Sequence, residues 1–230
     1  MIQERSAPMK PVIARLLGGL GRLATHTAAY HRFVGSMNIG YSEWHDGEPY
    51  DLDALAAVSP GERSQLETLL IQRKDADWRD AEALARIGSP AALRALSDSL
   101  RGPNREVRIR AAELLHGLGQ LDSLDAFIVE GLCFGELGEG LAASERLAAS
   151  HPSEAVIAAL LQGALCSNDG RAVRFVGILF FLHGKADEPF DWSHRAFFLR
   201  FSTHDRDERR KAFESLCQTL GIDGANVKCG

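Results

Sequence analysis

The chain has 230 residues, of which 45% are hydrophobic and 25% are charged, so it is long enough to bury a sizeable core. No long uncharged apolar run occurs, which excludes a transmembrane helix of ordinary length. Residues 1–36 carry five basic residues against one acidic residue, a balance of +4 within a net charge of −5. The remaining chain therefore has a balance of −9, which disfavours nucleic acid as a partner and favours a basic protein.

Residues 1–36 differ from the rest of the chain and are expected to form a separate N-terminal extension. The run VIARLLGGLGRLATHTAAYHRFVG predicts either a basic amphipathic helix with a Gly-weakened middle or a poorly ordered segment. A targeting peptide or a membrane-surface helix is an alternative. Translation from Met37 would make the extension dispensable, so the main domain is expected to span residues 37–230.

Helical signals follow in series after residues 37–53, whose sequence MNIGYSEWHDGEPYDLD predicts an ordered loop or cap. A short helix is expected over Leu52–Val58. The tetrapeptide Ser59-Pro60-Gly61-Glu62 is a capping box that opens a helix running to about Arg73. Asp77 is a candidate N-cap for Trp78–Ile87, which Gly88 ends. Similar signals predict helices over 90–100, 105–118, 156–166, 172–182 and 206–220.

Residues 77–132 repeat themselves at a spacing of thirty-one positions. The shift superposes Arg79 on Arg110, Ala81 on Ala112, Glu82 on Glu113, Leu84 on Leu115 and Gly88 on Gly119. Weaker continuations place helix breaks at His151 and Gly184. A period of this size is typical of helical hairpins that bury their apolar faces only by stacking. We therefore expect an all-α, right-handed α-solenoid of about four hairpins, with atypical caps near 37–76 and 187–230, and a frayed end beyond Gly221.

The repeat resembles a known family. The segment V-R-x-R-A-A-E-L-L-x-x-L-G (107–119) is similar to the short HEAT-like repeats also called phycobilisome-lyase repeats, and W-R-D-A-E-A-L-A-R-I-G (78–88) is a variant. The runs E-W-H-D-G, D-W-R-D-x-E-A-L-A and H-G-K-A-x-E-P-F-D-W also resemble bacterial HEAT-repeat proteins without an assigned activity. The resemblance implies binding of another protein along a concave face, without catalysis.

A minority of HEAT-like families are enzymes, and each of these activities requires residues that can be sought in this sequence. The di-iron hydroxylase needs repeated His-Glu dipeptides, and the sequence contains none. No motif of the chromophore lyases can be located. A DNA glycosylase needs a basic groove, for which Arg105, Arg108 and Arg110 are candidates, although the chain outside residues 1–36 is acidic. A glycosylase-like enzyme acting on nucleic acid is therefore the alternative function.

Three tryptophans lie among charged residues and are candidates for a protein-binding surface, because Trp and Arg are common in binding hot spots. The candidate residues are Trp44, His45, Asp46, Trp78, Arg79, Asp80, Arg110, Trp192, His194 and Arg195. The structural alternative is that each Trp packs across a repeat junction, while Arg79 and Arg110 form salt bridges between repeats. The Trp44 segment is the stronger functional candidate, since a loop has less reason to hold Trp and His together.

No catalytic, metal or cofactor motif appears. His26 and His31 are five residues apart, and neither metal-ligand spacing nor a phosphate-binding loop is present. The four cysteines, Cys133, Cys166, Cys217 and Cys229, contain no Cys-x-x-Cys pair and predict free, buried thiols in a reducing cytoplasm. The sequence thus predicts a cytoplasmic, non-catalytic protein that binds another protein without a cofactor. It acts as an adaptor or as a cognate inhibitor, such as an immunity protein that neutralises a basic toxin.

Overall fold

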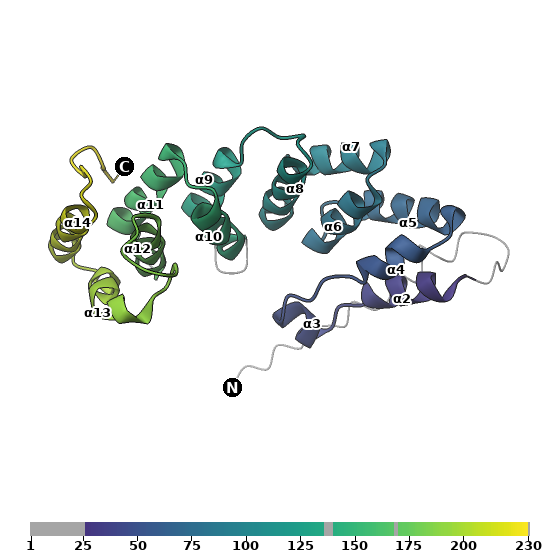
Figure 1. Ribbon diagram of the computed structural model, residues 1–230, viewed down its shortest axis with the longest axis horizontal. Helices are drawn as coiled ribbons and strands as arrows, with labels where there is room; N and C mark the ends of the chain where they lie inside the picture. The colour runs from purple at the N-terminus through teal and green to yellow at the C-terminus, as the bar shows by residue number, and fades with distance from the viewer. Residues whose placement is uncertain (1–25, 136–139, 168–169, 230) are drawn as a thin grey trace.

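The computed structural model describes residues 26–135, 140–167 and 170–229. Every regular element in these ranges is a helix, which confirms the predicted all-α class. The helices follow one another along the long axis in roughly chain order, from α2 at one end to α14 at the other (Figure 1). Their bounds are α2 Ala28–Ser36, α3 Tyr41–His45, α4 Leu52–Ala57, α5 Pro60–Arg73, α6 Trp78–Ile87, α7 Pro90–Ser99, α8 Arg105–Gly117, α9 Asp125–Phe134, α10 Leu141–Ser150, α11 Glu154–Cys166, α12 Arg171–Leu182, α13 Arg195–Phe198 and α14 Arg206–Leu220, with the 3-10 turns η1 Trp192–His194 and η2 Leu199–Ser202.

The helix boundaries follow the local capping signals. Ser59 and Glu62 form the predicted capping box at the start of α5, and the Asp77 side chain accepts a hydrogen bond from a backbone amide of α6. Gly88 ends α6 with φ +66°. This conformation favours glycine, because in other residues the Cβ would crowd the backbone. These ends depend on neighbouring residues alone, so the sequence predicts them well.

Two rows of helices make up most of the chain. Helices α6, α8, α10 and α12 contact one another in succession, and α7, α9 and α11 lie along the upper side of Figure 1. The buried side chains form two cores, and α8 contributes to both: Val107 and Leu115 belong to one core and Ile109 to the other. In the picture, α3 lies below α6 and α8, and α13 lies on the lower side near α12.

Residues 28–36 form a helix that belongs to the packed body. Helix α2 contacts α4, and Phe33 is fully buried in the N-terminal core. The Glu62 carboxylate accepts hydrogen bonds from the Thr27 amide and hydroxyl at 2.6 and 2.9 Å, which ties the start of α2 to α5. The packed region therefore begins before the expected boundary at residue 37. The predictions for residues 1–25, including a targeting or membrane-surface helix, lie outside the described residues.

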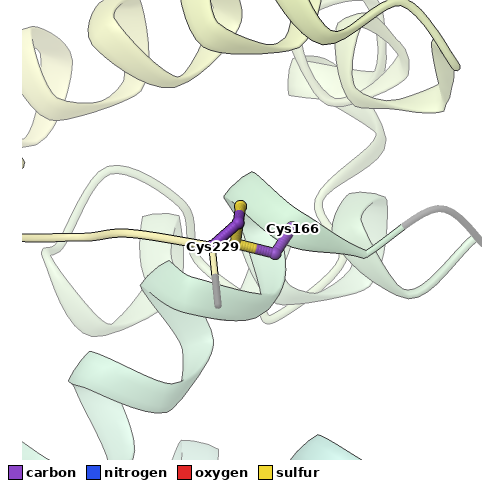
Figure 2. The surroundings of a disulfide bond; sticks show 2 residues. All are labelled: Cys166 and Cys229. Carbon is purple, nitrogen blue, oxygen red and sulfur yellow. A yellow bond between two sulfur atoms is a disulfide. The ribbon is translucent and has the colours of Figure 1, made fainter.

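Cysteine pairing corrects the prediction of four free thiols. Cys166 at the end of α11 and Cys229 near the C-terminus form a disulfide across 63 residues of sequence (Figure 2). Cys133 is an exposed free thiol and Cys217 a buried one. The pairing depends on how the C-terminal segment packs, which cysteine spacing does not reveal.

The segment after Gly221 is also better ordered than predicted. Ile222 and Val227 pack against the C-terminal core, and the Ile222 amide donates to the Cys217 carbonyl at 3.0 Å. Together with the disulfide at Cys229, these contacts attach the segment to the body, so the expectation of a frayed end was wrong.

No helix within the described ranges is long and apolar enough to cross a membrane.

Candidate functional site

Arginine–carboxylate pairs connect the helices of the α6–α8–α10–α12 row. Each joins an arginine of one helix to a glutamate of the preceding helix in the row: Arg110 with Glu82, Arg146 with Glu113, and Arg174 with Glu145. The glutamate side chains are mostly buried, whereas Arg146 and Arg174 are more exposed. Arg146 and Arg110 hold the pKa of Glu113 below its ordinary value despite the burial that opposes them. Arg110 thus forms a salt bridge that joins α8 to α6.

Arg79 has the repeat position of Arg110 but a different role. Its side chain is only 1% exposed, and its guanidinium donates to the backbone carbonyls of Glu48 at 2.5 Å and Glu43 at 3.2 Å. It also pairs with Asp77 and lies 4.4 Å from the centre of the half-buried Trp78 ring. Arg79 is thus too buried to contact a partner protein, and it fixes the segment on either side of Trp44 instead.

Asp80 is likewise a buried structural residue. Its carboxylate lies 3.3 Å from the Arg73 Nε and accepts a hydrogen bond from the Tyr50 hydroxyl at 3.3 Å. Burial raises the Asp80 pKa to about 6, and burial together with the Asp80 charge raises the pKa of Tyr50. This network joins the 50–53 segment to α5 and α6, and it removes Asp80 from the candidate contact surface.

Trp44, His45 and Asp46 are exposed at the N-terminal end of the row. Trp44 is 63% exposed, and its ring centre lies 6.2 Å from that of the exposed Tyr41 in the same helix. The His45 Nδ1 is 2.9 Å from an Asp46 carboxylate oxygen. The segment predicted as a loop contains the short helix α3, and its aromatic side chains are available to a partner.

Trp192, His194 and Arg195 form a separate group at the C-terminal end. Trp192 is 65% exposed. The centre of its ring lies 5.7 Å from the centre of the Phe190 ring and 5.1 Å from the Arg195 guanidinium. His194 packs against Phe180 at 5.2 Å. The ten predicted residues are therefore distributed among three places: α3 with the turn after it, helices α6 and α8, and this C-terminal group.

An apolar groove lies beside the C-terminal group. It has a volume of about 800 Å³ and runs between α10, α12, the 189–190 segment and η2. Its lining is Ala142, Glu145, Arg146, Ala149, Gly170, Val173, Arg174, Ile178, Pro189, Phe190, Leu199 and Ser202. The sequence pattern does not reveal this groove, because the residues near 187–230 predict only a terminal cap. Sequence periodicity gives no signal that Phe190 and Leu199 remain substantially exposed.

A second cavity, of about 660 Å³, lies between the ends of α9 and α11 and is lined partly by Cys133, Cys166 and Arg171. Arg171 donates to the carbonyls of Cys133 and Gly135, so its charge serves the local backbone. Cys133 is exposed as a residue, but partial desolvation raises the pKa of its thiol, which disfavours the reactive thiolate. These features do not form an activated nucleophile.

The arginines considered for a nucleic-acid groove are engaged with carboxylates. Arg108 pairs with Glu130 and donates to the Gly102 carbonyl, and Arg105 lies 3.8 Å from Glu130. No group of three or more His, Cys, Asp or Glu side chains suited to a metal ion occurs among the residues that the structure describes.

Comparisons with protein-family models, with curated proteins and with solved structures found no match.

Proposed function

We propose that the protein is a non-catalytic α-solenoid of HEAT-like hairpins that binds another protein. The successive contacts of α6, α8, α10 and α12, and their series of ion pairs, support this arrangement. The biological role in this proposal is that of an adaptor or a cognate inhibitor, such as an immunity protein that neutralises a toxin.

The groove between α10, α12 and η2 carries the proposal. Its walls are mainly aliphatic and aromatic, and two of the lining residues, Phe190 and Leu199, expose apolar surface to solvent. Monomeric proteins rarely leave adjoining apolar surface in water, and such surface commonly marks an interaction site. A partner side chain or helix that filled the groove would remove this surface from water and gain binding free energy.

The partner in this proposal is a protein with excess positive charge. The balance of −9 outside residues 1–36 attracts such a protein and repels nucleic acid. The pairing of Arg105, Arg108 and Arg110 with glutamates further weakens the case for a glycosylase groove. The cytoplasmic location remains a prediction, and the Cys166–Cys229 disulfide argues against it because reducing compartments keep thiols reduced.

Affinity capture with matched surface variants tests the proposal. The immobilised full chain is exposed to a lysate of the organism that encodes it, and the bound proteins are quantified. The double variant Phe190→Ala/Leu199→Ala truncates exposed residues of the groove. The control, Leu118→Ala/Phe134→Ala, truncates exposed apolar residues elsewhere. We expect the wild type and the control to retain one protein in stoichiometric amount and the groove variant to lose it.

The same preparation is incubated with alkylated duplex DNA. Release of free base, together with no stoichiometric protein on the wild-type chain, would overturn the proposal and support the glycosylase-like alternative.

A further inference from the structure

The sequence around α3 is acidic and contains exposed aromatic side chains. From Phe33 to Glu62 the chain has six carboxylate side chains and neither Lys nor Arg. Tyr41 and Trp44 are 77% and 63% exposed, the largest exposures among the bulky apolar side chains at this end. Exposed aromatic faces among carboxylates are a favourable environment for Lys and Arg side chains.

The cations near α3 do not neutralise its exposed carboxylates. Arg79 lies beneath the helix and donates to the main-chain carbonyls of Glu43 and Glu48, not to their side chains. Arg32 is engaged with Asp51 at 2.7 Å. The side chains of Glu43, Asp46 and Glu48 are exposed, and His45 contacts Asp46. The surface therefore keeps a negative potential while its aromatic rings face solvent.

The backbone that presents this surface is fixed before any partner arrives. The two hydrogen bonds from Arg79 reach carbonyls on either side of Trp44, and the Glu48 amide donates to the Glu43 carbonyl at 2.9 Å. A five-residue helix has little stability of its own, so these long-range contacts hold it in place. A partner then binds without the entropic cost of ordering the α3 backbone.

We propose that α3 and the turn that follows it, residues 41–48, bind a Lys- or Arg-rich segment of the partner protein. A cationic side chain lies over the Tyr41 or Trp44 ring, and neighbouring cations pair with Glu43, Asp46 and Glu48. This inference rests on the proposed function, and it places the basic part of the partner at the opposite end of the row from the apolar groove. Anionic occupants such as nucleic acid or an acidic membrane would be repelled.

A hexa-arginine peptide carrying a fluorescent label provides the probe, and its binding to the full chain is followed by anisotropy. The triple variant Glu43→Gln/Asp46→Asn/Glu48→Gln neutralises the surface. The matched control, Asp98→Asn/Asp122→Asn/Glu154→Gln, removes the same charge from exposed positions on other helices and loops. We expect about tenfold weaker binding for the first variant and less than about twofold for the control, because binding depends on the local charges.

Two tryptophans of nearly equal exposure separate the aromatic contribution from the charge. Trp44→Ala should weaken hexa-arginine binding by about twofold to fivefold, the range expected for an exposed cation–π contact. Trp192→Ala, which removes a tryptophan 65% exposed at the other end, should leave the affinity unchanged. A hexa-glutamate peptide should show no binding to any of these proteins.

Several outcomes would overturn the inference. One is equal hexa-arginine affinity for the triple variant and its control. Another is a captured partner that depends on Phe190 and Leu199 but is retained in full by the triple variant, which would leave the proposed function standing. A third is an affinity raised about tenfold by Arg15→Gln/Arg22→Gln, because the occupant would then be the basic N-terminal segment of the chain itself. Selective hexa-arginine binding without any captured protein would refute the proposed function and retain the α3 site.

Discussion

Arg79 and Glu48 are 31 residues apart, and the Arg79 Nε donates a 2.5 Å hydrogen bond to the Glu48 carbonyl. A second bond from the same guanidinium reaches the Glu43 carbonyl, so one buried side chain spans the ends of the segment that carries Trp44. The planar guanidinium directs its donors along fixed lines, which suits it to two carbonyls of different residues. An almost fully buried arginine therefore positions the short helix that exposes Trp44.

Replacement of Arg79 by Met should destabilise the protein and release α3. The change leaves two carbonyls and Asp77 without their cationic partner, and we expect the free energy of unfolding to fall by about 2–4 kcal/mol. Arg79→Lys should recover only part of the loss, since an ammonium lacks the planar fork. Urea denaturation measures both, with the exposed Arg94→Met as control. An unchanged stability in Arg79→Met would contradict this role.

The raised pKa of Asp80 predicts a pH dependence of stability. Because the folded pKa of about 6 exceeds the ordinary value of 3.8, the folded state binds more protons between these pH values. The contribution of Asp80 to the free energy of unfolding therefore falls by up to about 3 kcal/mol as pH rises from 4 to 6. Above pH 6 this contribution is constant.

Asp80→Asn removes this titration. The difference in unfolding free energy between wild type and Asp80→Asn, measured by urea denaturation from pH 4 to 8, should decline through the lower half of that range. All other carboxyl groups titrate in both proteins and cancel in the difference. A difference that stays constant with pH would show that Asp80 does not titrate as proposed.

Gly177 allows α12 to approach the segment that walls the groove. A Cβ at this position would lie 2.3 Å from the Pro189 carbonyl oxygen, so Gly177→Ala must displace the 189–190 segment. We expect Gly177→Ala to lower the free energy of unfolding by about 1–3 kcal/mol and to weaken the affinity for a protein that binds in the groove. Gly117→Ala in α8 meets open space and should be neutral or stabilise by up to about 1 kcal/mol. Equal melting temperatures for the two variants would refute the close-contact argument.

The disulfide should contribute substantially to stability, since it closes a loop of 63 residues. Cys166→Ser/Cys229→Ser should lower the free energy of unfolding by up to about 4 kcal/mol, whereas Cys133→Ser should change it little. Thiol titration of the native wild type should detect Cys133 readily and Cys217 only after unfolding, because Cys217 is buried. Four reactive thiols in the denatured, unreduced protein would show that the bond does not form.

Local sequence signals predicted most of the longer helices and their ends, but not the contacts between distant segments. The capping box at Ser59 and the glycine stop at Gly88 act within one helical turn, so they can be found by inspection. Helix α3 has Gly40 at its N-cap and therefore no side-chain cap, and its stability comes from Arg79 far along the chain. Its helical form was therefore not predictable from residues 41–45.

The candidate surfaces show the same limit. Trp44 and Trp192 were predicted as surface candidates from their charged neighbours, and both are exposed. Arg79 and Asp80 have an equally polar sequence context, yet the packing of α6 against α4 and α5 buries them. The groove and the disulfide depend on how the chain after residue 183 returns to α10, α11 and α12, which no short sequence pattern encodes.

The direction of the ion pairs along the helix row has a consequence for synthesis of the chain. In each pair the glutamate is made first, and its arginine follows 28, 33 or 29 residues later. A ribosome that has just released α6 or α10 thus exposes a helix whose carboxylate, Glu82 or Glu145, still lacks its arginine partner and is costly to bury. Because α8 and α12 supply those arginines, we expect the carboxylates of α6 and α10 to be buried only after the next helix of the row has been made.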